Sequence, residues 1–408
     1  MQGALGDNQT VVGLKSGFMV FNSRKGLMHS AWARWVWGSL CCLAIIGWDL
    51  AHRLPAPALA QARWPITTPL GDKPLVLQAQ GHIPMPPNTP AAHASSLLSM
   101  PAGGPEAVLA FWFAGTKESA PDIGIAASGF DRATQQWQPA RWVLERQALG
   151  QALGFGVRRI GNPVAWLDAD HKVHLFVVAT GPGGWAASRI VHLRQSNAGI
   201  GVAQLAFEPV RVLPLSWWWN VSHLVRAAPL ALQDGGMVLP VYFELGLKYP
   251  VALRFDRQGE FLGMVRMSQR THVLQPTLVM QSERHWLAFM RDQRPEGRVT
   301  VAQTQDAGQS WQDVSDLALV NPDASVAGLG LAPGRMLLAH NSSPHSRTLL
   351  DLSQSANGQD WTLAHALAHG SAAQEFSYPA MAWADNSLWV SYTDQRQRIA
   401  WQRLGIKP

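Results

Sequence analysis

The stretch TQDAGQSW occupies residues 304–311, directly behind the alternating run RVTVAQ at residues 298–303. The alternating run predicts a β-strand, and the stretch behind it predicts a tight turn. Asp306 can accept backbone N–H bonds inside that turn, Gly308 permits a positive φ, and Trp311 can pack over it. We therefore expect residues 304–311 to close a turn between two strands.

A strand–turn–strand pattern recurs six times along the chain. In each copy, two strands are joined by a turn rich in Gly, Asp or Asn, and the second strand is strongly apolar. The copies lie at residues 93–113, 162–178, 228–244, 275–291, 324–341 and 378–394. Four of them carry Pro at the second position, where a strand tolerates the missing N–H.

A third strand follows each of these pairs, and a fourth follows in five copies. The third strands are expected at residues 122–128, 188–194, 250–255, 298–304, 347–353 and 398–404. The run PLVLQAQ at residues 74–80 can supply the fourth strand of the last copy. Four strands repeated six times, with the two chain ends joined in one blade, predict an all-β fold, a six-bladed β-propeller over residues 61–408. Ring closure removes exposed sheet edges.

The opening turn lies between the third and fourth strands of the fourth repeat, and weaker copies occupy the same place elsewhere. Residues 355–361 keep Gly358 and Trp361 but place Ala356 where the Asp is expected. All these turns should lie on one face of the propeller, because each joins a third strand to a fourth.

The composition agrees with an all-β protein and excludes some partners. Charged residues make up 15% of the chain and hydrophobic residues 47%, with 36 Gly and 27 Pro, which excludes a disordered chain. The net charge of +6 is spread without a dense Lys/Arg run, so nucleic acid is not an expected partner. A mild positive field suits an anionic small ligand or a glycan.

Cysteine and histidine usage predicts neither a metal site nor a cofactor. The chain has two cysteines, the adjacent Cys41 and Cys42, so it has no disulfide framework and no Cys-based metal site. The 14 histidines are scattered without the spacing of metal ligands on a helix.

The N-terminal residues 1–60 are expected to form a leader. The apolar segment 35–50, whose core reads WVWGSLCCLAIIGW, follows three basic residues and precedes the A-x-A sequence at residues 58–60. This order predicts export to the periplasm or the cell exterior by a signal peptide. The alternative is an uncleaved anchor that attaches the protein to the inner membrane.

The pattern [ST]-x-D-x-G-x-[ST]-W at such a turn resembles the Asp box of the sialidase (BNR-repeat) superfamily. With the segments at residues 115–125, 375–382 and 391–401, the chain is similar to the bacterial predicted-neuraminidase family. The resemblance implies a sialidase-like propeller and an exported exo-α-sialidase-like glycoside hydrolase for sialic acid or another acidic sugar. Because non-sialidase propellers also carry Asp boxes, the alternative is a non-catalytic glycan-binding propeller in envelope polysaccharide handling.

Propeller geometry predicts where a site lies. Loops between strands two and three, and those leading into the next first strand, lie on the face opposite the Asp boxes. The polar residues expected to converge there are His93, Lys117, Glu118, Asp122, Asn162, Arg226, Glu244, Gln275, Arg291, Asp292, Asn321, Asn341, Arg347, Tyr378 and Arg396. Polar residues at the ends of apolar strands suit a ligand funnel.

The resemblance also assigns roles. Sialidases bind the substrate carboxylate with an arginine cluster, protonate the leaving group with a carboxylic acid, and attack with a Tyr that a Glu activates. This implies Tyr378 as nucleophile, Glu244 as its partner, and Asp122 or Glu118 as acid/base. The substrate-binding residues would be His93, Lys117, Asn162, Arg226, Gln275, Arg291, Asn321, Asn341 and Arg347.

One feature departs from a simple sialidase pattern, and one further segment is open to two interpretations. Strand alignment places His93 where the superfamily carries its first arginine. The aromatic run SWWWN at residues 216–220 can serve as a carbohydrate platform, or its tryptophans can pack over the neighbouring blade.

Overall fold

The computed structural model describes residues 24–52, 60–71, 73–199, 201–216 and 218–407. They fall in two compact units, Met1–Arg53 and Leu54–Pro408. Helix α1 (Arg24–His52) forms the described part of the first unit. Within the described residues, no helix combines the length and apolar content needed to cross a membrane, which leaves the predicted anchor unsupported. Most of the predicted cleavage sequence lies outside them.

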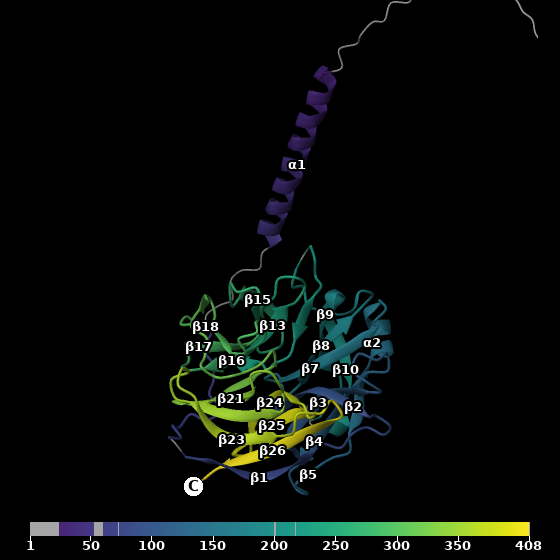
Figure 1. Ribbon diagram of the computed structural model, residues 1–408. Coiled ribbons are helices and arrows are strands. Elements are labelled where there is room, and N and C mark those ends of the chain that lie inside the picture. The colour runs from purple at the N-terminus through teal and green to yellow at the C-terminus, as the bar shows by residue number, and fades with distance from the viewer. Residues whose placement is uncertain (1–23, 53–59, 72, 200, 217, 408) are drawn as a thin grey trace, which may run out of the picture. The chain divides into compact units, whose positions relative to one another are not determined.

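The second unit is a six-bladed β-propeller, as predicted, and each blade is an antiparallel sheet (Figure 1). Blade 1 contains β2 (Ala91–Ser99), β3 (Glu106–Gly115), β4 (Gly124–Asp131), β5 (Gln136–Trp137) and β6 (Arg141–Glu145). Blade 2 contains β7 (Arg159–Leu167), β8 (Val173–Thr180), β9 (Ser188–Gln195) and β10 (Phe207–Val212). Blade 3 contains β11 (His223–Val225), β12 (Leu230–Ala231), β13 (Met237–Phe243), β14 (Tyr249–Phe255) and β15 (Phe261–Arg266).

The other three blades repeat the plan. Blade 4 contains β16 (Val273–Met280), β17 (Trp286–Asp292), β18 (Thr300–Thr304) and β19 (Gln312–Asp313). Blade 5 contains β20 (Ala327–Ala332), β21 (Arg335–Asn341), β22 (Leu349–Ser355) and β23 (Thr362–His369). Blade 6 contains β24 (Phe376–Ala384), β25 (Ser387–Asp394), β26 (Arg398–Ile406) and β1 (Leu75–His82). Short helical segments, α2 (Arg146–Leu153), η1 (Gly184–Ala187) and η2 (Val202–Gln204), lie in connections.

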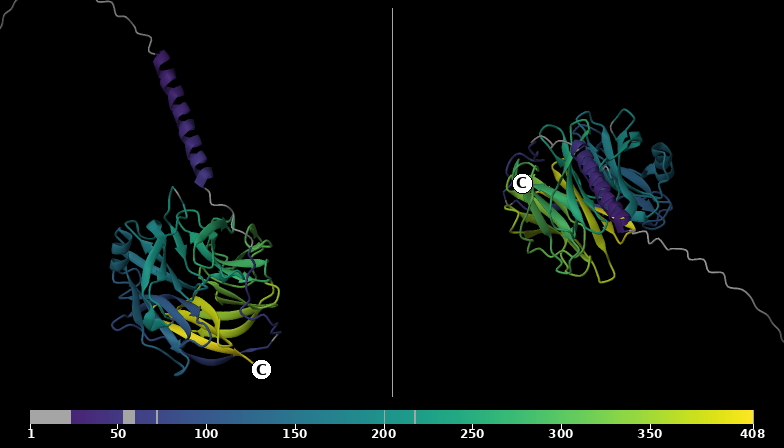
Figure 2. Two further views of the ribbon diagram at one scale, coloured as in Figure 1. Left: turned by 180° about the vertical axis from the view of Figure 1, so that it is seen from behind. Right: turned by 90° about the horizontal axis from the view of Figure 1, so that it is seen from above.

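The ring closes through β1, as the run at residues 74–80 predicted. Strand β1 pairs antiparallel with β26, from Leu75 opposite Ile406 to His82 opposite Ala400. Figure 2 shows the colour running around the ring in chain order, so the first and last strands meet in one blade. This pairing covers the edge of β26 that would otherwise be exposed and joins the two ends of the chain in one blade.

Aromatic side chains fill the seam between the closing blade and blade 1. Phe130 and Trp137 of blade 1 meet Trp389 and Trp401 of blade 6 with ring centroids 4.6 to 6.2 Å apart. All four are buried. Such packing stabilises by apolar burial and by about 0.5–1.5 kcal/mol per well-oriented aromatic pair.

The turn at residues 304–311 has the predicted structure. Asp306 accepts hydrogen bonds from the Thr304 hydroxyl (2.7 Å) and from the Ser310 backbone N–H (2.9 Å). Gly308 has a φ of 85°, and the Trp311 indole donates to the Gly308 carbonyl (3.2 Å). The Asp box is therefore satisfied by its own turn.

The corresponding turn of blade 5 corrects one prediction. Asn357, not Ala356, takes the place of the Asp, because its Oδ1 accepts from the backbone N–H groups two and three residues further on, both at 2.9 Å. Ser355 accepts from the Gly358 N–H (2.8 Å), and the Trp361 indole donates to Gly358 (3.1 Å). The blade 5 turn is one residue shorter before its Trp than the turn at residues 304–311, so alignment of the two turns on the Trp misplaces the Asp position by one residue.

Candidate functional site

The innermost strands of four blades carry the same irregularity, a β-bulge close to the first residues of the strand. Strands β2, β7, β16 and β24 each shift register by one residue against their partners. A residue inside each break has a positive φ: Ala94 (54°), Asn162 (46°), Gln275 (50°) and Tyr378 (54°). A bulge re-aims a side chain, and strained non-Gly residues cluster at functional sites. The predicted residues Asn162, Gln275 and Tyr378 thus occupy equivalent positions.

Tyr378 is half-buried and held by Gln275. The Gln275 side-chain amide donates to the Tyr378 hydroxyl (3.2 Å) and to the Tyr242 hydroxyl (3.4 Å). Its carbonyl oxygen accepts from the Arg291 guanidinium (3.2 Å). One amide therefore connects two tyrosines with an arginine. Tyr242 was missed from the sequence, although it lies two residues before the predicted Glu244.

Arg226 lies over the Tyr378 ring, 4.9 Å from its centroid. The guanidinium is buried, which lowers the pKa of Arg226 to about 10. It donates to the backbone carbonyls of Ser95 (3.2 Å) and Pro379 (2.9 Å). Arg226 therefore braces the centre of the propeller through backbone carbonyls of blades 1 and 6. It also places a positive charge against one face of the Tyr378 ring.

His93 contacts the same tyrosine, with ring centroids 4.1 Å apart. Burial lowers the pKa of His93 well below its usual range, and the positive charges of Arg396 and Arg226 lower it further. The imidazole is therefore neutral at physiological pH. A neutral His at this position cannot replace an arginine as a permanent cation for a carboxylate.

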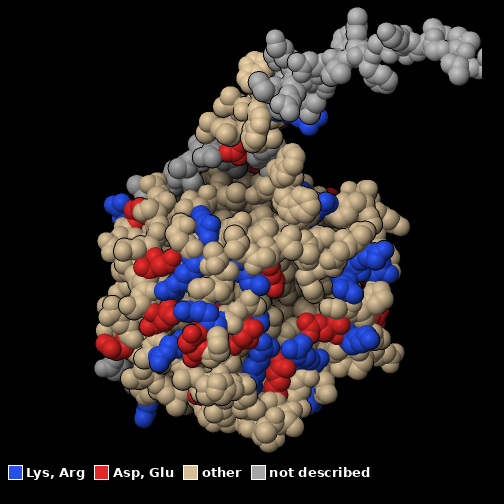
Figure 3. Space-filling view, turned by 45° about the horizontal axis from the view of Figure 1, so that its top comes forward, with Lys and Arg blue, Asp and Glu red and all other residues tan. Residues whose placement is uncertain are grey.

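Ion pairs between blades surround this centre. Arg291 pairs with Asp323 (2.5 Å), Arg347 with Glu375 (3.1 Å), and Arg396 bridges Glu375 (3.1 Å) and Glu118. Figure 3 shows Lys and Arg side chains interspersed with Asp and Glu around a hollow on one face. The funnel is thus lined by arginines that already have acidic partners.

The pKa of Glu375 reflects these contacts. Burial alone would raise it, but hydrogen bonds from Arg396 and Ser377, with the charges of Arg396 and Arg347, lower the pKa of Glu375 to about 2. Glu375 and Asp323 were both missed from the sequence. A signal existed for Glu375, because it lies three residues before Tyr378 in the quoted segment EFSYPAMA.

Glu244 differs from the other carboxylates. It follows β13 and is half-buried, and burial raises its pKa, while Arg291 and Lys248 act in the opposite direction. Among the described residues, its carboxylate has no hydrogen bond or ion pair. The predicted pairing of Glu244 with Tyr378 is not seen as a hydrogen bond among the described residues, where the Tyr378 hydroxyl accepts from the Gln275 amide.

The predicted acid/base residues have other partners. Asp122 is exposed and accepts from the backbone N–H and the hydroxyl of Thr116, both at 2.9 Å, so it braces its own loop. Glu118 is bonded by Arg396. Lys117, in the same loop, is exposed to solvent. The structure therefore brings Glu118 to the funnel rim and gives Asp122 a local role.

Two predicted ligand residues brace loops instead. Asn321 and Asn341 are fully buried, and Asn321 Oδ1 accepts from the Asn341 backbone N–H (3.1 Å). Both amide groups donate to backbone carbonyls at 2.9 Å. The amide donors of both asparagines are therefore used within the fold, and their predicted role in holding a ligand stays a prediction.

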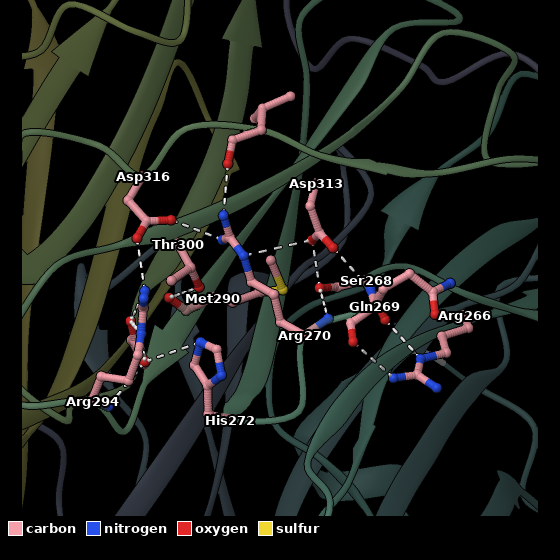
Figure 4. Close-up of polar contacts among 12 residues, drawn as sticks. Arg266, Ser268, Gln269, Arg270, His272, Met290, Arg294, Thr300, Asp313 and Asp316 are labelled. Carbon is pink, nitrogen blue, oxygen red and sulfur yellow. Dashed lines mark hydrogen bonds and ion pairs between the residues drawn. The ribbon is translucent and has the colours of Figure 1, made fainter.

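A second charged network lies in blade 4 beside the funnel. Figure 4 shows Arg270 and Arg294 both pointing toward Asp316, each with a 2.8 Å contact. Arg294 also bonds Asp292 (2.6 Å), which is fully buried. The predicted convergence of Asp292 on the funnel is therefore replaced by an ion network that ties loops of blade 4 together.

The aromatic run at residues 216–220 exposes its described tryptophans. Trp218 and Trp219 have 71% and 56% of their surface accessible. Asn220 holds the loop by accepting from Leu215 N–H (3.1 Å) and donating to the Leu213 carbonyl (2.8 Å). These two rings are therefore largely exposed to solvent, while Trp217 lies outside the described residues.

Across the part of the chain that the structure describes, no group of three or more His, Cys, Asp or Glu side chains gathers to hold a metal ion.

Comparisons with known proteins agree with the fold. The model of the BNR repeat-like domain matches residues 106–390. The Hadza microbial sialidase Hz136 superimposes with a TM-score of 0.63 at 15% identity, covering 77% of this chain and 65% of that one. Trypanosoma rangeli sialidase in complex with 2,3-difluoro-KDN gives 0.61 at 12% identity, covering 80% and 57%. A protein of unknown function from Dyadobacter fermentans gives 0.63 at 12% identity, covering 82% and 99%.

The chain thus spans 65% and 57% of the length of the two sialidases. Identities this low show a shared fold and nothing finer. No curated protein matches the chain.

Proposed function

Because the chain belongs to the BNR repeat-like domain family, we propose that it is a sialidase-like glycoside hydrolase for sialic acid or another acidic sugar. One observation carries the proposal. The Tyr378 hydroxyl accepts a hydrogen bond from Gln275, Gln275 is held by Arg291, and Arg226 lies over the ring. Positive charge and a donor around a phenolic oxygen stabilise the negative charge that develops when it acts as a nucleophile.

Glu244 is the carboxyl group best suited to exchange a proton in this site. Its pKa is raised by burial, so it holds a proton at higher pH than an exposed Glu does. In the proposed reaction the Tyr378 oxygen bonds to the anomeric carbon as the bond to the leaving oxygen breaks. Glu244 takes the tyrosine proton while Glu118 supplies a proton to the leaving oxygen. Water then attacks the anomeric carbon and gives its proton to Glu118, and Tyr378 takes its proton back from Glu244 as its bond to the sugar breaks.

Arg347 and Arg396 are the arginines placed to meet the substrate carboxylate. Their side chains are 19% and 44% exposed, and they share Glu375. In Arg226, in contrast, the two terminal nitrogens donate to backbone carbonyls. A substrate carboxylate would compete with Glu375 for the two rim guanidiniums, and bidentate arginine contacts suit that exchange.

A second candidate function is supported by a specific observation. His93 occupies the place of an arginine and is buried, and the arginines of the funnel rim are already ion-paired. Because these arginines already pair with carboxylates of the protein, they are less available to bind the carboxylate of a substrate. This favours a site that holds a glycan over one that hydrolyses an acidic sugar. The alternative is therefore a non-catalytic glycan-binding propeller.

We also propose that residues 1–60 direct export, so that the propeller from residue 61 works in the periplasm or outside the cell. The order of basic residues, apolar segment and A-x-A sequence supports this proposal. N-terminal sequencing of protein recovered from cell fractions tests it. A chain that stays in the cytoplasmic fraction with an intact N-terminus would contradict it.

Hydrolysis of a fluorogenic sialoside by the full chain tests the enzyme. We expect turnover to fall by more than about 10³-fold in Tyr378→Phe, because the nucleophile is lost. Tyr249→Phe is the matched control, since Tyr249 packs against Phe243 in blade 3. Equal turnover in both variants would exclude Tyr378 as nucleophile. No turnover by a folded wild type, together with retention on a glycan array, would establish the binding protein.

A further inference from the structure

Two neighbouring loops on the funnel face of blade 3 expose large apolar side chains. Trp218 and Trp219, between β10 and β11, expose 71% and 56% of their surface. Leu245 and Leu247, between β13 and β14, expose 44% and 62%. We call these four side chains the apolar ridge. The other exposed large apolar side chains in the described part of the propeller are scattered over the outer strands of four blades: Val76, Leu77, Val210, Met264 and Leu363.

The two loops of the ridge rise from one point of the blade 3 sheet. Strand β11 pairs antiparallel with β13, with His223 opposite Phe243. The Glu244 backbone N–H, at the start of the second loop, donates to the Ser222 carbonyl at the end of the first (3.0 Å). Because Glu244 also supplies the half-buried carboxyl group of the candidate site, the ridge lies at the rim of the funnel.

Hydrogen bonds within the loop hold the tryptophan loop in shape. The Ser216 hydroxyl accepts from the Trp219 backbone N–H (3.0 Å), and the Trp219 carbonyl accepts from the Val221 N–H (2.8 Å). Asn220 adds two bonds to the backbone at the start of the loop. Because the loop is already ordered, contact through its rings costs little further conformational entropy.

The size and charge of the ridge fit a lipid surface better than a protein partner. A stable protein interface takes roughly 800 Å² from each partner, which is more than the exposed parts of two Trp and two Leu side chains offer. The loops at residues 213–222 and 244–248 contain one acidic and one basic residue, Glu244 and Lys248, so no net charge steers an ionic partner to them. Trp prefers the boundary between headgroups and acyl chains, and Leu enters the acyl layer.

We propose that the apolar ridge docks the propeller on a phospholipid bilayer, with the funnel mouth turned toward the glycans that this bilayer carries. The tryptophan rings lie at the level of the headgroups, and the leucines reach the acyl chains. The docking follows from the ridge alone, whereas the substrate that it implies rests on the proposed function: an acidic glycan attached to a lipid.

Flotation of the full chain with vesicles of phosphatidylcholine and phosphatidylglycerol measures the docking. Helix α1 also exposes apolar side chains, so every protein compared carries Leu43→Lys and Ile46→Lys to suppress binding through that helix. In this background, Trp218→Ser combined with Leu247→Ser should lower the partition coefficient about 30-fold, because two large apolar side chains no longer leave water.

The matched control is Met264→Ser combined with Leu363→Ser, which removes two exposed apolar side chains from outer strands. This control should bind vesicles as the protein with the intact ridge does. Equal partition of the ridge variant and the control variant overturns the docking. Absence of vesicle binding by the protein with the intact ridge overturns it as well.

Turnover of one glycan on two carriers tests the substrate. We expect the KM for sialyllactosylceramide in vesicles to be about tenfold lower than the KM for free sialyllactose, because docking concentrates the protein at the lipid surface. Leu245→Ser combined with Leu247→Ser should remove this difference and keep the KM for free sialyllactose. An unchanged ratio of the two KM values overturns the lipid-linked substrate. If neither substrate is turned over, the proposed function fails, and flotation still decides whether the ridge docks.

Discussion

The Asp-box turn on one face of the propeller and the centre of the funnel on the other are built by different kinds of contact. On the Asp-box face, Asp306 bonds Thr304 and Ser310, all within one turn of a single blade. On the funnel face, the side chains that matter bond across blades: Gln275 with Tyr378 and Arg291 with Asp323 lie 103 and 32 residues apart. The Asp-box turn is thus closed locally, whereas the centre of the funnel is assembled from distant parts of the chain.

This difference explains why the Asp box reveals the fold without revealing the chemistry. A turn whose polar groups bond within the turn can keep its structure whatever chemistry the opposite face carries. The funnel, in contrast, depends on blade closure for its geometry. Substitutions on the two faces should therefore differ in the ratio of their effect on stability to their effect on activity.

The largest loss of stability is expected from Asn321→Ala on the funnel face. The change removes an acceptor from the Asn341 N–H and donors from two buried carbonyls. Leaving these groups unsatisfied should lower the free energy of unfolding by about 3 kcal/mol, measured by urea denaturation. Asn197→Ala, at an exposed turn of blade 2, is the control and should have little effect. A small loss in Asn321→Ala would show that the funnel loops do not depend on this brace.

The next prediction distinguishes a role of Gln275 in positioning Tyr378 from a role in folding. Gln275→Leu removes the amide that joins Tyr378, Tyr242 and Arg291. We expect kcat to fall by about 10²-fold, the size of one lost preorganised donor, with KM changed much less. Gln275→Glu keeps an acceptor for Arg291 but loses the donor, so it should be impaired as well. An equal loss of kcat and stability in Gln275→Leu would assign Gln275 to folding alone.

The sequence could predict the repeating parts of this molecule because they follow local rules. Alternating apolar residues located the six blades, and the run at residues 74–80 located the closing strand. Strand order also placed Gln275 and Tyr378 together, since both begin innermost strands. Local patterns were enough to locate the strands and their turns, although the position of the capping residue in the blade 5 turn was missed.

The partners on the funnel face could not be predicted in this way. Tyr378 bonds Gln275 where Glu244 was expected, and Asp122 turns back to Thr116. The first choice depends on how loops from separate blades lie against one another, which no periodicity encodes. The second is a contact within one loop, six residues apart, that strand patterns do not describe. Glu375 was missed for the same reason, because its two arginine partners enter from other loops.

Acid should weaken the funnel face through Glu375. Its pKa is lowered from 4.5 to about 2, so the stabilisation is present above pH 4.5 and is lost as the pH falls toward 2. Glu375→Gln should therefore cost about 2 kcal/mol at pH 7, less than the full shift because part of the carboxylate meets solvent. Denaturant unfolding of both proteins at pH 7 and pH 3 measures this. A difference that does not shrink in acid would show that Glu375 acts by packing.

The smallest effect should come from the Asp-box face, and it completes the comparison. Asp306→Ala removes the acceptor of the Thr304 hydroxyl and the Ser310 N–H in a turn that is only partly buried. We expect a loss of about 1 kcal/mol in unfolding free energy, as for other local caps, and unchanged turnover of the sialoside. Asp360→Ala in blade 5, where the carboxylate bonds only the exposed Asn357 amide, should cost less. If Asp306→Ala lowered turnover in a folded protein, the two faces would be coupled, and the independence argued from their contacts would be wrong.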